Sequence, residues 1–171
     1  MTDVRRIIPE EFDRWNELLH LIRTSFLYMD GIIDPPSSAH RLNLQSLKEK
    51  AASEICFIAM QGSEISGCIF CRPEPPDELY IGKLAVRPQM QGQGLGRQLL
   101  EAAESVAFAS GHSRLRLETR IELAGNHATF SRWGFVKSAE RSHPGYDRVT
   151  FIEMVKTLAA PVAEASQLLR D

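Results

Sequence analysis

The sequence predicts a single α/β domain with a mixed central sheet flanked by helices. Apolar residues switch repeatedly between period two and period 3.6 along the chain, which gives the element order βααββ followed by βαβαββ. A chain of 171 residues is also long enough to bury one core without disulfides or a metal. We expect the domain to span residues 1–158, with residues 159–171 forming a tail that could be helical.

Composition and charge exclude several classes of function. The chain is 43% hydrophobic and 25% charged with a net charge of −2, so no basic face for nucleic acid is expected. The charged start at Arg5 and Arg6 is followed by Pro9 and not by an apolar run, which argues against a signal peptide. No run has membrane-spanning length, so we expect a cytoplasmic protein with no membrane partner.

The first third predicts a strand and two helices. Residues 4–8 form the strand, and a helix begins at Pro9 or Glu10. Its apolar positions recur at helical spacing: Phe12, Trp15, Leu18, Leu19, Ile22 and Phe26. The proline- and serine-rich residues 34–38 indicate a loop, and a second helix covers residues 44–52.

Residues 56–60 and 65–71 predict a β-hairpin. Cys68 and Cys71 in its second strand have the spacing of a redox or zinc motif. However, strand residues three apart point to opposite faces, and Cys56 alone cannot complete a second pair. We therefore expect small buried residues and no metal site.

The second half continues with a strand at residues 79–86 and a helix from Leu95 that Gly111 closes. The helix is expected from one apolar stripe, made by Leu95, Leu99, Ala102, Ala103 and Val106. An alternating strand follows at residues 114–119, and then a short helix at residues 127–132. A final hairpin has its two strands at residues 135–139 and 149–154.

The turn between the strand at residues 79–86 and the helix that begins at Leu95 is dense in glycine. It reads Gln91-Gly92-Gln93-Gly94-Leu95-Gly96. Glycines let backbone N–H groups face a ligand and let phosphate oxygens approach without a Cβ in the way. The first turn of a helix adds unpaired donors and the positive end of the dipole. A pyrophosphate site is expected, because glycines this dense would otherwise only cost stability.

Two familiar phosphate motifs do not fit this turn. A P-loop needs a lysine and a hydroxyl residue after the last glycine, where Arg97 and Gln98 stand. A dinucleotide site needs Gly-x-Gly-x-x-Gly after the first strand, whereas this Gly-x-Gly-x-Gly turn lies well inside the chain.

The motif instead resembles the coenzyme A motif of the GNAT superfamily of N-acetyltransferases, Arg/Gln-x-x-Gly-x-Gly/Ala. The similar residues are Leu84-Ala85-Val86-Arg87-Pro88, then Gln91-x-x-Gly94-x-Gly96 with Arg97-x-Leu99-Leu100. Residues 130–135 resemble the Tyr-x-x-x-Gly-Phe segment of the same family. The element order matches as well, so the resemblance covers nearly the whole chain and implies an acyl-CoA N-acyltransferase-like fold.

The resemblance implies acetyl-CoA as the cofactor. In that family the strand before the turn runs beside the pantetheine arm and diverges from the next strand, which leaves a slot for the thioester. The implied cofactor-binding residues are Leu84, Ala85, Val86, Gln91, Gly92, Gln93, Gly94, Leu95, Gly96, Arg97, Asn126, Phe130 and Arg132. Asn126 is displaced from the family position, and Arg132 could equally be a solvated helix charge.

The implied reaction is direct attack of a primary amine, on a small molecule or peptide, at the thioester. A protonated amine has no lone pair, so a base or an ordered water must remove a proton. Glu118 occupies a strand position that carries a glutamate base in some relatives; a surface ion pair with Arg116 or Arg120 is the alternative. Tyr80 lies where other relatives carry a base, and could instead be a packed aromatic residue.

Phe130 stands at the position of the family's usual general acid, a tyrosine, and cannot donate a proton. Transfer need not stop, since thiols ionise near pH ~8.5 and thiolates leave readily. In the loop between the last two strands, Tyr146 could replace the acid while Asp147 or His143 contacts the amine. The alternative is a plain turn with Tyr146 packed and Asp147 paired to Arg148.

Two rival functions remain at this point. Phe130 keeps open a non-catalytic, coenzyme A-binding regulatory module, and the glycine turn keeps open a nucleotide- or dinucleotide-binding enzyme. The sequence does not identify the acceptor amine. Many relatives of this kind dimerise, so a homodimer is a further expectation that the sequence leaves open.

Overall fold

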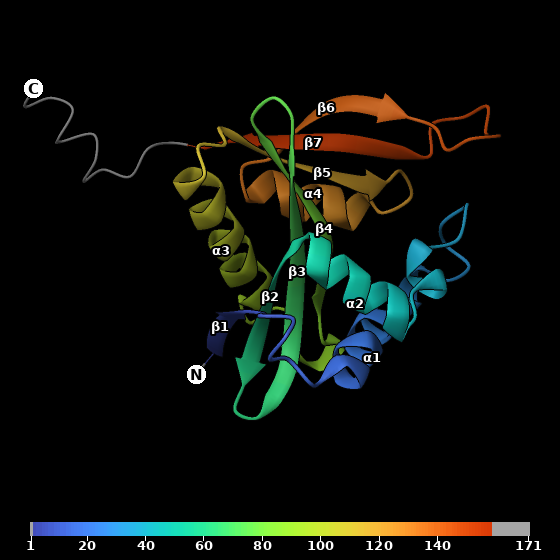
Figure 1. Ribbon diagram of the computed structural model, residues 1–171. Helices are drawn as coiled ribbons and strands as arrows, with labels where there is room; N and C mark the ends of the chain where they lie inside the picture. Colours follow the sequence, from blue (N-terminus) through green and yellow to red (C-terminus); the bar gives the residue numbers. More distant parts are fainter. Residues whose placement is uncertain (1, 159–171) are drawn as a thin grey trace, which may run out of the picture.

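The computed structural model describes residues 2–158, and in this part of the chain seven strands form one mixed sheet in the order β1-β2-β3-β4-β5-β7-β6 (Figure 1). Only β4 and β5 pair in parallel. The strands are β1 (Thr2–Arg6), β2 (Ile55–Gln61), β3 (Glu64–Glu74), β4 (Glu78–Val86), β5 (Arg114–Arg120), β6 (Val136–Arg141) and β7 (Phe151–Thr157). The helices are α1 (Trp15–Phe26), α2 (Leu44–Ser53), α3 (Leu95–Ala109) and α4 (Ala124–Arg132).

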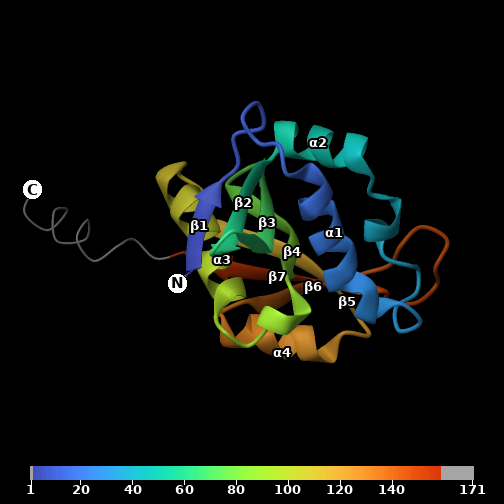
Figure 2. The ribbon, with the colours of Figure 1, turned by 90° about the horizontal axis from the view of Figure 1, so that it is seen from below.

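Helices cover both faces of the sheet, as the sequence predicts: α1 and α2 lie on one face, α3 and α4 on the other (Figure 2). Alternation along β3 divides its side chains between the two cores, with Cys68 and Phe70 under α1, and Ile69 and Cys71 under α3. The two cysteines therefore point to opposite faces and cannot form a site together. All three cysteines are free and buried, and residues 2–158 contain no cluster of potential metal ligands.

Several element boundaries differ from the prediction: β1 ends at Arg6 and not at residue 8, β3 runs on to Glu74, and α4 begins at Ala124 and not at residue 127. The first helix begins at Trp15, because residues 8–12 form only a separate turn, closed by the N–H groups of Glu11 and Phe12 on the carbonyl of Ile8. The final strand begins at Phe151 and not at residue 149. Within residues 2–158 no helix is long and apolar enough to cross a membrane. The predicted tail, residues 159–171, lies outside the described residues.

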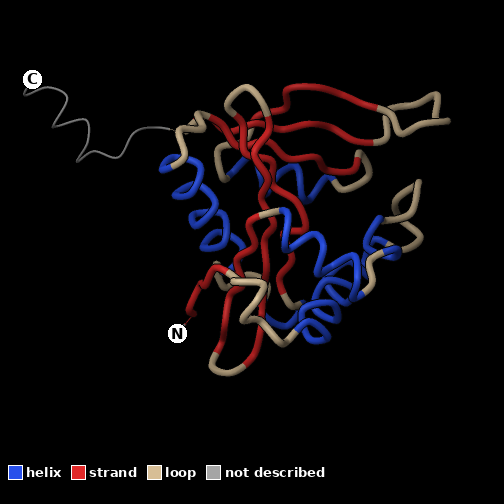
Figure 3. Tube along the Cα trace, in the orientation of Figure 1, coloured by secondary structure: helices blue, strands red, loops and turns tan. Residues whose placement is uncertain are grey.

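The sheet opens between β4 and β5. These strands pair only from Glu78 to Ile81 on β4, although both run on beyond the last pair, to Val86 and Arg120 (Figure 3). The register between β3 and β4 also slips near Lys83, which has a φ of +47°. A bulge bends its strand and interrupts the ladder, so the slip helps β4 to diverge. The divergence that the family resemblance implies is therefore confirmed.

Candidate active site

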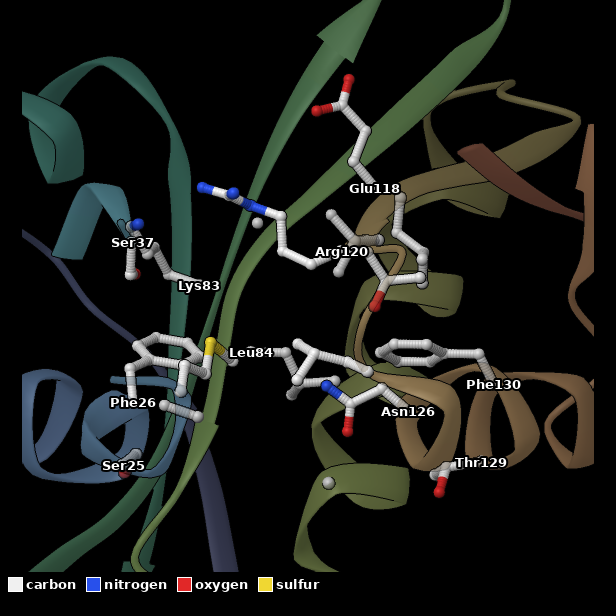
Figure 4. Close-up of a pocket in the computed structure, with 18 of the residues that line it drawn as sticks. Ser25, Phe26, Ser37, Lys83, Leu84, Glu118, Arg120, Asn126, Thr129 and Phe130 are labelled. Atoms are coloured by element: carbon white, nitrogen blue, oxygen red, sulfur yellow. The ribbon is translucent and has the colours of Figure 1, made fainter. Parts of the chain in front are cut away.

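A cavity of about 1080 Å³ fills the gap between the diverging strands (Figure 4). One end is formed by the glycine turn and the start of α3. The other end is formed by residues 35–38 and by the loop at residues 143–146. This volume is slightly above the range of about 300–1,000 Å³ that is usual for a ligand pocket, so there is room for an extended cofactor.

The glycine turn has the backbone shape that an anion cradle needs. Gly92 and Gly94 have φ values of +80° and +84°, a region that residues with a side chain rarely adopt. Gly94 is the N-cap of α3, and no side chain in the described chain caps that helix. A Cβ on Gly96 would stand 3.1 Å from the ring of Trp133, so the turn also needs a glycine to pack against α4. The uncapped N–H donors fit a pyrophosphate.

The β4 residues predicted beside the pantetheine arm, Leu84, Ala85 and Val86, all line the cavity. Their edge of β4 faces the gap, since the pairing with β5 has already ended. The carbonyl of Val86 accepts hydrogen bonds from Ser25 Oγ and Gln91 Nε2, both at 3.2 Å. A carbonyl has two lone pairs, so this one is fully used, and only the N–H of Val86 remains for a ligand.

The predicted residues on α4 form one wall of the same cavity. Phe130 packs edge to face on Trp133 and Phe135, with ring centroids 5.8 and 5.9 Å away. Asn126 donates a hydrogen bond to Tyr28 Oη at 3.1 Å, and Arg132 also lines the cavity. Of the predicted cofactor residues, Gln93 is the one that does not contribute to the cavity wall.

Glu118 lines the cavity and is also held by an ion pair, so its two predicted alternatives coexist. Arg116 donates to Glu118 Oε1 at 3.0 Å and, at 3.0 Å each, to both carboxylate oxygens of Glu74. The same guanidinium donates to Glu153 at 3.2 Å. Hydrogen bonds from Arg116 hold the pKa of Glu74 below its ordinary value. Oε2 of Glu118 has no partner among the described residues, which leaves it free to accept a proton.

Tyr80 lies on the cavity wall between two guanidinium groups. The centres of the Arg72 and Arg116 guanidinium groups are 4.4 and 4.7 Å from the centroid of its ring. Burial raises the pKa of Tyr80 to about 12, so its phenol stays protonated at neutral pH. A protonated phenol is a poor base, so Glu118 is favoured over Tyr80 in that role.

The loop between β6 and β7 reaches across the acceptor end of the cavity. Tyr146 donates a hydrogen bond to Asp34 Oδ1 at 2.8 Å, and Arg148 pairs with Asp34 Oδ2 at 3.1 Å. The alternative turn with an Asp147–Arg148 pair is therefore wrong, because Arg148 is committed to Asp34. The hydrogen bond to Asp34 raises the pKa of Tyr146, so this phenol also keeps its proton. His143 lines the cavity beside it.

Much of the cavity wall was not predicted, and three of the residues that were missed contribute a charge or a ring to the site: Lys83, Arg120 and Trp133. The position of Lys83 depends on the strand bulge, which no residue pattern announces. Arg120 was expected only as a partner of Glu118, yet it bonds to backbone carbonyls of residues 35 and 36. Trp133 belongs to the site because its ring packs against Gly96, and residue spacing gives no sign of that contact.

A cradle for a pyrophosphate, a slot between diverging parallel strands and a carboxylate in the same cavity define an acyl-CoA-dependent acyltransferase. Comparison with known proteins identifies the family. The model of the Acetyltransferase (GNAT) family matches residues 15–135. An IAA acetyltransferase of Azospirillum brasilense is 33% identical over 130 residues, 75% of this chain and 82% of that protein. The chain belongs to the GNAT acetyltransferase family.

Solved structures have the same fold. The PaiA N-acetyltransferase from Thermoplasma acidophilum, in complex with coenzyme A, superposes with a TM-score of 0.75 at 17% identity, covering 92% of this chain and 99% of that one. The ribosomal-protein-S18-alanine N-acetyltransferase from Escherichia coli gives 0.70 at 21% identity, covering 94% and 96%. As a GNAT member the chain is an acetyl-CoA-dependent acetyltransferase, and the dinucleotide alternative is set aside.

Proposed function

We propose that this chain transfers the acetyl group of acetyl-CoA to a primary amine of a small molecule or peptide by direct attack. One observation carries the proposal: a single cavity joins the glycine cradle to a carboxylate, Glu118, along the gap between β4 and β5. Bound acetyl-CoA supplies an acetyl group activated as a thioester. The names of the structural neighbours, which include N-acetyltransferases, support an amine as acceptor.

The side chains and backbone groups of the site then have separate roles. Glu118 removes a proton from the ammonium form of the acceptor, directly or through an ordered water. Arg116 fixes the orientation of Glu118 through its hydrogen bond to Oε1 and leaves Oε2 toward the acceptor. The backbone groups of Leu84, Ala85 and Val86 would hold the pantetheine arm, and the N–H groups of Gly94, Leu95 and Gly96 would hold the pyrophosphate.

Tyr146 is the candidate proton donor for the departing thiolate, in place of the missing tyrosine at Phe130. We expect Tyr146→Phe to lower kcat by about tenfold, a small effect because a thiolate leaves readily. The KM for acetyl-CoA should stay unchanged. Steady-state kinetics measure both values, and the added change Phe130→Tyr should restore kcat if a phenol at either position suffices. An unchanged kcat in Tyr146→Phe would show that the thiolate leaves without an enzyme acid.

An assay with acetyl-CoA and a panel of primary amines tests the function as a whole, with release of free thiol as the readout. Turnover with at least one amine, together with the acetylated product by mass spectrometry, is the expected result. Tight binding of acetyl-CoA without turnover of any amine would favour the non-catalytic regulatory module. A homodimer in the cytoplasm is part of the proposal, and sedimentation of the purified chain tests the dimer.

A further inference from the structure

The acceptor end of the cavity is rich in positive charge. Arg41, Lys83 and Arg120 line it, whereas Glu118 is the only carboxylate residue in the whole lining of the described chain. Glu118 already interacts with Arg116, which lies outside the cavity wall. The cations at this end therefore outnumber the carboxylates that could neutralise them.

Two of these cations are anchored to one short segment. Lys83 Nζ donates to Ser38 Oγ at 2.6 Å. The guanidinium of Arg120 donates to the carbonyl oxygens of Pro35 at 2.7 Å and Pro36 at 3.2 Å. Because all three acceptors lie within four consecutive residues, the two charged groups converge on the same part of the cavity. In Figure 4, Arg120 reaches from β5 toward Lys83 on β4.

Neither cation has a carboxylate of its own in the described chain. Their hydrogen-bond partners are neutral oxygens, Lys83 Nζ also lies 5.8 Å from the centroid of the Phe26 ring, and no ion pair within 4 Å includes Lys83 or Arg120. The nearby acids have other partners: Asp34 binds Tyr146 and Arg148, and Glu122, the acid that acts most on the pKa of Arg120, accepts the N–H of residue 34.

The surroundings of Lys83 disfavour its charged form. Its charged neighbours are Lys50, Arg41 and Arg120, all positive. Burial and this repulsion lower the pKa of Lys83 to about 8, so it still carries its charge at neutral pH. A desolvated cation without a counter-ion destabilises a fold, and such a cost is usual where a ligand provides the missing charge.

We propose that Lys83 and Arg120 bind a carboxylate of the acceptor, so that the acceptor is a compact amine carrying a carboxylate, such as an amino acid. The proposal rests on the N-acetyltransferase function above. Arg120 follows Glu118 by two residues on the same face of β5, a separation of about 7 Å along a strand. An amine at Glu118 and a carboxylate at Arg120 would thus be only a few bonds apart in the acceptor.

Matched acceptors test this inference. Each amino acid is compared with its own primary carboxamide, by calorimetry on the coenzyme A complex and by thiol release with acetyl-CoA. We expect the carboxylate form to bind about 10–100-fold more tightly, the range for charge-assisted pairing. Carboxylates that bind but are never acetylated would support this inference and overturn the proposed function. Equal use of the carboxamides, or no binding of any carboxylate form, would overturn this inference.

Substitution of Lys83 gives a second, independent readout. Lys83→Met should remove the preference for the carboxylate form and leave the KM for acetyl-CoA unchanged. It should also raise the melting temperature by about 2–4 °C, since it removes a repelled, desolvated cation. Lys83→Arg keeps the charge and should keep the preference.

Lys50→Met is the matched control. Lys50 is also close to Lys83, but it pairs with Glu54 at 2.7 Å and does not line the cavity. This variant should lower the melting temperature and leave the acceptor preference intact. If Lys83→Met kept the full preference for the carboxylate form, as Lys83→Arg and Lys50→Met are expected to do, Lys83 would not be part of the carboxylate site. That site would then have to lie elsewhere.

Discussion

Replacing Gly94 with valine is expected to weaken the binding of acetyl-CoA by at least about 100-fold. The φ of Gly94 is +84°, and a β-branched residue there costs about 1–2 kcal/mol, so the turn rearranges. The N–H groups at the start of α3 then no longer converge on the pyrophosphate. Each hydrogen bond to a charged group is worth about 1.5–3 kcal/mol, so the loss of one or two accounts for the expected change. Calorimetry with coenzyme A measures the dissociation constant directly.

Gly62→Val is the control for backbone strain. Gly62 has a φ of +60° in the β2–β3 turn, away from the cavity. A Cβ would meet no atom within 4 Å at either Gly62 or Gly94, so the two substitutions differ only in location. Both should lower stability, but only Gly94→Val should affect the cofactor. A folded Gly94→Val variant with the parent's affinity would contradict the cradle.

Replacing Glu118 with glutamine is expected to lower kcat/KM by about 100-fold or more at pH 7, in the usual range for loss of a general base. The amide keeps the size of the side chain and can still interact with its neighbours, but it cannot accept the proton. The defect should shrink as the pH approaches the pKa of the acceptor amine, because the amine then loses its proton to solvent. A pH–rate profile of both proteins measures this change.

Glu153→Gln separates catalysis from the ion-pair network. Glu153 accepts a hydrogen bond from the same Arg116 Nη1 at 3.2 Å, yet it does not line the cavity. Its variant should retain activity within a few-fold of the parent at every pH. If both variants lost activity equally, or if the Glu118→Gln profile matched the parent's, an ordered water would become the better candidate for the base.

Much of the fold could be predicted because its signals are local. Alternating and helical periods predict the strands and helices, and the same alternation sends Cys68 and Cys71 to opposite faces. The start of α1 was the most informative exception. Pro9 and Phe12 fit a helix, but residues 8–12 close a separate turn before Trp15. The local pattern could not distinguish one continuous helix from a turn followed by a helix.

The candidate site divides in the same way between local and distant contacts. The sequence by itself determined the glycine cradle, since the turn and the helix start are contiguous and their N–H groups follow from backbone geometry. Only the tertiary structure decided the acceptor end. Lys83 bonds to a residue 45 positions away, Arg120 to one 85 away, and Arg148 to one 114 away. Such partners depend on how the sheet opens and how loops pack over it, and neither is encoded in residue spacing.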